Sequence, residues 1–119
     1  MKTWNEVQAE KLQLERDQEG LENTQRSVRQ TEESYEEYFF HQSTLFEELQ
    51  EEFAQSETDL LYQDMAEQIH WQKRALQEVL EEQEHEMKKE LQGIEDKKEA
   101  LAWAERAIAK AEKEEQNEY

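Results

Sequence analysis

The chain has 119 residues, which suggests a single domain, and its 32 acidic residues against 14 Lys and Arg give a net charge of −18. So acidic a surface disfavours nucleic acid and anionic membranes as partners, because binding a phosphate backbone needs a basic patch. The absence of Cys excludes disulfides and thiolate chemistry.

The sequence predicts neither membrane insertion nor a secretory leader. It has no run of about 18 apolar residues that could span a bilayer, and residues 1–12, MKTWNEVQAEKL, lack the apolar core of a signal peptide. We therefore expect a cytoplasmic location. Export together with a partner, by a route that uses no leader, stays open.

A first helix is predicted over about residues 3–54. The chain has no Pro and two Gly, and it is rich in residues that favour helices. High charge and low hydropathy are also typical of disorder, so the hydrophobic period has to decide. Apolar residues recur every seven positions, which is the seam pattern of a coiled coil with positions labelled a to g. One ladder, at position d, starts at Val7 and the other, at position a, starts at Trp4.

A second helix is predicted over about residues 60–115, after a bend at about 55–59. Its ladders include Leu80, Met87, Ile94, Leu101 and Ile108. Two capping signals support the boundaries: Thr3 with Glu6 opens the first helix, and Ser56 followed by Asp59 marks the break.

The two ladders match when the chain folds back on itself. Val7 then faces Ile108, and every further layer is made by two positions whose numbers add to the same value, so that apolar residues meet apolar residues. Polar seam positions also meet, with Gln18 opposite Lys97. A parallel dimer of one long helix loses this match. The prediction is an all-α fold, an antiparallel two-helix coiled-coil hairpin that can complete a three- or four-helix bundle with a partner.

Aromatic residues crowd the chain before the bend, in YEEYFFHQSTLFEELQEEF (35–53). Tyr35, Phe39, Phe46 and Phe53 fall in the seam, where we expect them to form core. Because polar seam residues such as Gln18 weaken the middle of the hairpin, the layers near the bend are expected to contribute more to stability than the layers near the termini.

One edge of the hairpin near the bend is apolar. Tyr38, Leu45, Met65 and Val79 occupy g positions and define this apolar edge, whereas the opposite polar edge carries Ser43, Gln50, His70 and Gln77 at e positions. A two-helix hairpin buries too little surface by itself, so the apolar edge is predicted to bind another helix. The alternative is that long Glu and Gln stems merely cover the rings. The predicted partner-binding residues, which add three nearby residues to the edge, are Tyr38, Phe40, Leu45, Leu61, Met65, Trp71 and Val79.

No catalytic or metal-binding constellation is visible. His41, His70 and His85 do not share a helical face, and none has a second His three or four residues away. There is no phosphate-binding loop or nucleophile elbow. We therefore expect no enzyme activity, no cofactor and no metal.

The segment TEESYEEYFFHQSTLFEELQEEF (31–53), followed by a long arm rich in Glu, Gln and Lys, resembles the LXG-toxin-associated α-helical (Lap-type) small proteins of type VII secretion in Gram-positive bacteria. The resemblance covers most of the chain and implies a WXG-like helical hairpin. It implies a targeting chaperone, or adaptor, that binds the helical targeting domain of a toxin or a sister small helical protein. The Trp-x-Gly turn of WXG proteins is absent, since residues 55–59 read QSETD.

Two other functions fit the same physical features. One is a coiled-coil stalk of a type III or flagellar export ATPase, although such stalks usually carry a more basic surface. The other is a generic coiled-coil spacer, which would not need an apolar edge. Self-association is a further possibility for the partner.

Overall fold

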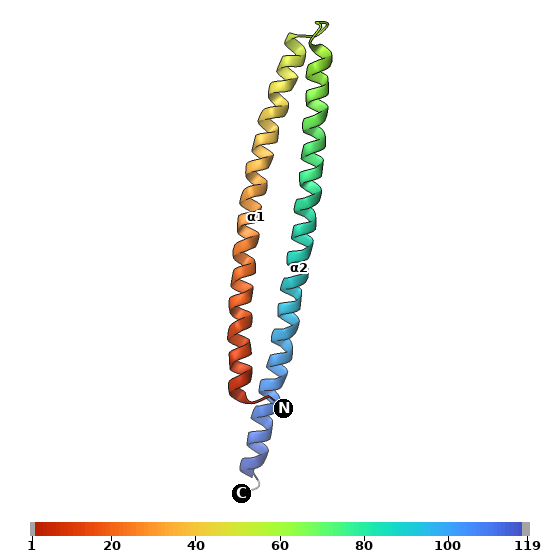
Figure 1. Cartoon of the computed structure of the whole chain (residues 1–119). Helices are drawn as coiled ribbons and strands as arrows, with labels where there is room; N and C mark the ends of the chain where they lie inside the picture. The colour runs from red at the N-terminus through yellow and green to blue at the C-terminus, as the bar shows by residue number, and fades with distance from the viewer. Residues whose placement is uncertain (1, 118–119) are drawn as a thin grey trace. The chain divides into compact units, whose positions relative to one another are not determined.

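The computed structural model describes residues 2–117, and these residues form two long helices and no strand (Figure 1). Helix α1 spans Trp4–Glu52 and helix α2 spans Asp59–Asn117. The all-α prediction is confirmed, as is the packing of the two helices against each other. Contacts divide the chain into two units. We call residues 2–25 with 86–117 the terminal unit, and residues 26–85 the bend unit.

A capping hydrogen bond and a left-handed residue account for the two ends of α1. The Glu6 backbone N–H donates to Thr3 Oγ1 at 3.2 Å, as the capping signal predicted. At the other end, Gln55 has a φ of 66°, a left-handed conformation that a helix cannot contain. The helix therefore ends at Glu52, two residues before the predicted boundary.

Ser56 is not the N-cap of α2, contrary to the sequence-based prediction. Its hydroxyl donates to the Phe53 backbone carbonyl at 2.6 Å, so it satisfies a carbonyl at the end of α1. Thr58 directly precedes α2, and its carbonyl accepts the N–H of Tyr62 at 3.1 Å. The Ser56 hydroxyl also lies 2.9 Å from the Thr58 hydroxyl, so it is engaged within the turn and does not cap α2.

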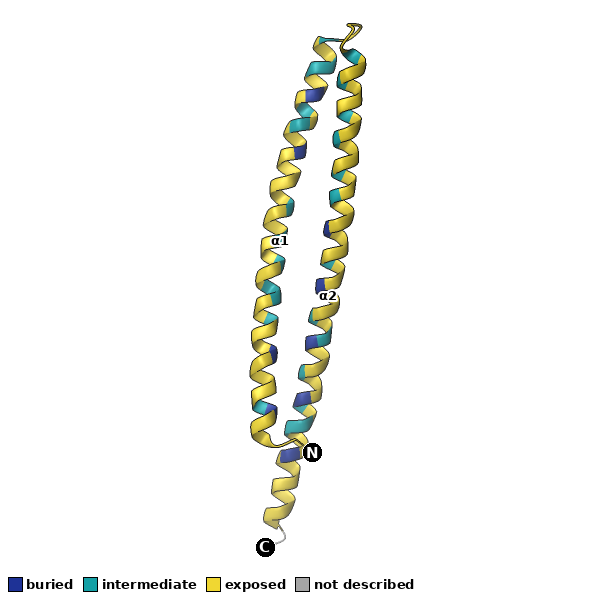
Figure 2. Cartoon of the chain, in the orientation of Figure 1, coloured by how far each residue is buried: buried dark blue, intermediate teal, exposed yellow. Residues whose placement is uncertain are grey.

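The terminal unit holds the most continuous hydrophobic core. The start of α1 lies beside the C-terminal part of α2 (Figure 1), and buried positions line the facing sides (Figure 2). Leu21 and Ala104 pack against the core. These contacts follow the predicted antiparallel pairing. The cluster comprises Val7, Leu14, Ile94, Leu101 and Ile108.

Polar contacts flank this core between the two helices. Gln8 Nε2 donates to Glu105 Oε1 at 3.0 Å, and Lys11 Nζ lies 3.3 Å from the same oxygen. Gln18 accepts a hydrogen bond from Lys98, one position beyond the Lys97 that the pairing predicted. A long Lys stem reaches from a flanking position into the seam, which explains the displacement.

The bend unit also pairs α1 with α2, and it buries fewer hydrophobic residues. Phe53 and Tyr62 pair as predicted, with ring centroids 5.5 Å apart. The buried hydrophobic residues of this unit are Phe39, Phe46 and Leu80. The buried core is thus larger in the terminal unit, opposite to the expectation that the bend layers dominate.

Tyr35 departs from its predicted place in the core. Its side chain is 43% exposed, although its ring stacks on that of Phe39 at 6.3 Å. The rings of Phe39 and Phe46 are buried in the same seam, so the difference lies in the Tyr35 hydroxyl, which favours water.

Candidate partner-binding surface

Exposed apolar side chains concentrate in the bend unit. Among residues 2–117, twelve large hydrophobic side chains are exposed, and nine of them belong to this unit. Scattered exposed apolar residues are normal, whereas a concentration of them marks an interaction surface. All seven predicted partner-binding residues are exposed: Tyr38, Phe40, Leu45, Leu61, Met65, Trp71 and Val79.

The heptad register places five of the seven on one side of the helix pair. Tyr38 and Leu45 occupy successive g positions of α1, and Met65 and Val79 occupy g positions of α2. In an antiparallel pair the g positions of both helices border the same side of the seam. Leu61 lies at a c position, which neighbours g on a helix. These five residues therefore share the apolar side.

Buried neighbours hold the α1 part of this edge in place. The Tyr38 ring packs edge-on against the Phe39 ring, with centroids 5.4 Å apart, and Phe39 is buried. Leu45 directly precedes the buried Phe46. The exposed residues thus stand on a fixed helical frame, so a partner would meet a preorganised surface.

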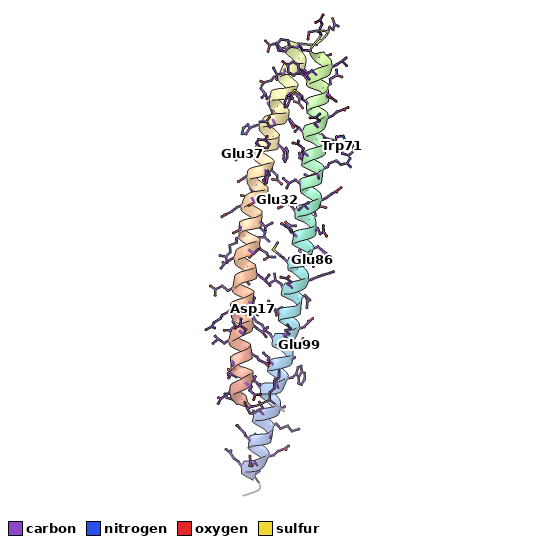
Figure 3. All side chains as sticks on the ribbon, in the orientation of Figure 1. Asp17, Glu32, Glu37, Trp71, Glu86 and Glu99 are labelled. Carbon is purple, nitrogen blue, oxygen red and sulfur yellow. The ribbon has the colours of Figure 1, made fainter. Side chains whose placement is uncertain are left out.

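Phe40 and Trp71 lie away from the apolar edge. Phe40 is at a b position, on the flank next to the polar edge, and its ring contacts His41 edge-on at 5.9 Å. Trp71 projects from an outer f position of α2 (Figure 3), with the Arg74 guanidinium 5.9 Å from its ring. These two residues do not extend the apolar edge as a continuous surface.

Sequence reasoning missed a groove along the polar edge. It has a volume of about 680 Å³ and is lined by Gln50, Gln63, Ala66, Glu67, His70 and Trp71. Ala66 occupies a seam position of α2, and its small side chain leaves space between longer polar neighbours. The signal available in the sequence was this single small residue at a seam position.

A carboxylate pair lies in the seam of the bend unit. Partial burial of Glu32, and after it the nearby Glu84 carboxylate, raises the pKa of Glu32 above its usual value. A hydrogen bond between the two carboxyls, which requires one shared proton, acts in the same direction, as do Glu36 and Glu33. The constant sum that pairs Val7 with Ile108 also pairs Glu32 with Gln83, and the structure places the next residue of α2, Glu84, beside Glu32.

The described residues contain no group of three or more His, Asp or Glu side chains placed to hold a metal ion. Over the same part of the chain, neither helix has a stretch long and apolar enough to cross a membrane. The exposed apolar surface of the bend unit is thus the strongest candidate site of this chain.

Comparison with known proteins gives one family. The model of a family described as protein of unknown function (DUF3958) matches residues 2–108, which include all of α1 and α2 as far as Ile108. No curated protein and no solved structure matches the chain.

Proposed function

The chain belongs to the DUF3958 family, and we propose that it is a non-enzymatic helical adaptor that binds a second helical protein along its apolar edge. The proposed partner is the helical targeting domain of a type VII secreted toxin or a sister small helical protein. In this role the chain acts as a targeting chaperone that helps to deliver the toxin for export.

One observation carries the proposal: the apolar edge is exposed, and the bend unit that carries it buries few hydrophobic residues. Tyr38, Leu45, Met65 and Val79 are between 39% and 52% exposed. Two helices cannot cover the g positions at their own border, whereas a third helix packed alongside would cover them. Burying the exposed part of each side chain would contribute on the order of 1 kcal/mol.

The exposed apolar edge and the net charge separate this function from its alternatives. A spacer needs a covered seam and has no use for an exposed apolar edge. An export stalk works inside an ATPase ring and usually carries a more basic surface than this chain, whose net charge is −18. Neither alternative accounts for apolar residues on one side of the bend unit and polar residues on the other.

Co-purification with matched variants tests the proposal. The tagged chain is expressed in its own cells, and captured proteins are identified by mass spectrometry. The double variant Tyr38→Glu/Leu45→Glu should lose a captured helical protein that the wild type retains. The control Ser43→Glu/Gln50→Glu adds the same charge at the same seven-residue spacing on the polar edge, and it should retain that protein.

Circular dichroism at 222 nm shows whether each variant stays helical, as expected from the exposure of Tyr38 and Leu45. If the apolar-edge variant is helical and still captures the partner, this edge is not the binding site. Loss of the partner only in the polar-edge control would place the site at the groove beside Trp71 and would refute the proposal.

A further inference from the structure

We propose that the partner docks on the apolar edge with a cationic amphipathic helix, whose Lys or Arg residues flank its apolar face. This inference rests on the proposed function and specifies the chemistry of the partner.

The negative charge is concentrated in the bend unit. Its 60 residues contain 16 Asp and Glu against four Lys and Arg, a net charge of −12, whereas the rest of the chain contributes −6. Residues 30–72 contain twelve Asp and Glu and no Lys or Arg. Eight of the exposed large hydrophobic side chains lie in the same stretch. Exposed apolar surface and unbalanced negative charge therefore coincide.

The carboxylates beside the apolar edge are free to pair with a partner. Glu48 and Glu52 occupy c and g positions of α1, on the same side as Leu45, and both are exposed. In the described part of the bend unit, the one ion pair joins His41 and Glu37 at 3.8 Å and forms only when His41 is protonated. Glu37 itself lies at an outer f position of α1, away from the apolar edge (Figure 3).

The spacing of the apolar residues fits a helix. Tyr38 and Leu45 are seven residues apart, and Met65 and Val79 are fourteen apart. A helix that packs alongside presents a side chain every seven residues, about 10 Å along its axis, and so meets each of these positions in turn. Its flanking positions would then lie next to Glu48 and Glu52, where Lys or Arg gains attraction and Glu meets repulsion.

Charge argues against the other occupants of this surface. A second copy of the chain would bring a second bend unit of −12 against the first. Anionic lipid and nucleic acid are repelled in the same way. A cationic helix satisfies both the apolar and the acidic part of the surface.

Two synthetic helical peptides of about four heptads test the inference. Both carry the same Leu seam, and their flanking positions are all Lys in one and all Glu in the other. Binding of each fluorescently labelled peptide to the full chain is followed by anisotropy at about 50 mM and about 500 mM NaCl, since screening becomes strong within this range. The Lys peptide should bind at least about ten-fold more tightly than the Glu peptide at low salt, and high salt should reduce this preference.

Isosteric variants locate the attraction. Glu48→Gln/Glu52→Gln should weaken binding of the Lys peptide about five-fold. The control Glu15→Gln/Glu19→Gln removes two exposed carboxylates with the same four-residue spacing from the terminal unit and should leave affinity unchanged. Equal binding of the two peptides, absence of binding by both, or equal losses in the two Gln variants would each overturn the inference. A natural partner that lacks a cationic face would overturn it too while leaving the proposed function intact, because loss of binding in Tyr38→Glu/Leu45→Glu tests that function separately.

Discussion

Two phenylalanines of α1 provide a matched test of the seam in the bend unit. Phe46 is 8% exposed and Phe40 is 68% exposed, although they lie six residues apart on the same helix. A Phe side chain buries roughly 200 Å² when fully covered. The difference in exposure is then about 120 Å² of apolar surface, equivalent to about 3 kcal/mol.

Phe46→Ala should lower the free energy of unfolding by about 3 to 5 kcal/mol, because it removes a buried ring and leaves a cavity. Phe40→Ala should lower it by less than about 1 kcal/mol, as expected for an exposed position. Urea unfolding followed by circular dichroism at 222 nm gives both values. Equal costs for the two variants, or a cost of Phe46→Ala below about 1 kcal/mol, would show that the burial pattern of α1 is wrong.

Two further predictions concern the pairing of the helices and its dependence on pH. Leu21→Cys/Ile94→Cys should form a disulfide within one chain under oxidation, since Leu21 packs against the core of the terminal unit and Ile94 belongs to it; crosslinks found only between chains would contradict the antiparallel pairing. Because the folded state raises the pKa of Glu32, its protonation stabilises the folded chain at low pH, and this stabilisation is lost as pH rises through the raised pKa. Glu32→Gln should therefore raise the melting temperature at neutral pH, and its advantage over the wild type should shrink as pH falls toward about 4. An advantage that is independent of pH would show that the ionisation of Glu32, disfavoured by its burial and by Glu84, is not the cause.

The heptad ladders predicted the fold because a two-helix coiled coil repeats one simple contact. Val7 and Leu101 were assigned to the seam from their spacing, and both are buried in the terminal unit. The same spacing placed Tyr35 in the core, where it is half-exposed. Periodicity predicts which residues face the seam, but it does not predict how far a Tyr ring, whose hydroxyl favours water, is buried there.

The candidate surface was predictable to the extent that it follows the helical register. Tyr38, Leu45, Met65 and Val79 are exposed g residues, as their positions indicate. Trp71 was assigned to the same surface by proximity in sequence, yet it lines a groove on the polar edge. That groove depends on the small volume of one seam residue and on the rotamers of its long neighbours, which the binary pattern of polar and apolar residues does not encode.

The affinity of the purified chain for the partner identified by co-purification tests the central claim most directly. The Kd is measured by calorimetry for the wild type and for the two matched double variants. Tyr38→Glu/Leu45→Glu should weaken binding at least about 30-fold, since each change removes an apolar contact and adds a charge to the interface. Ser43→Glu/Gln50→Glu should stay within about three-fold of the wild type. An apolar-edge variant that is helical and binds with wild-type affinity would contradict the account.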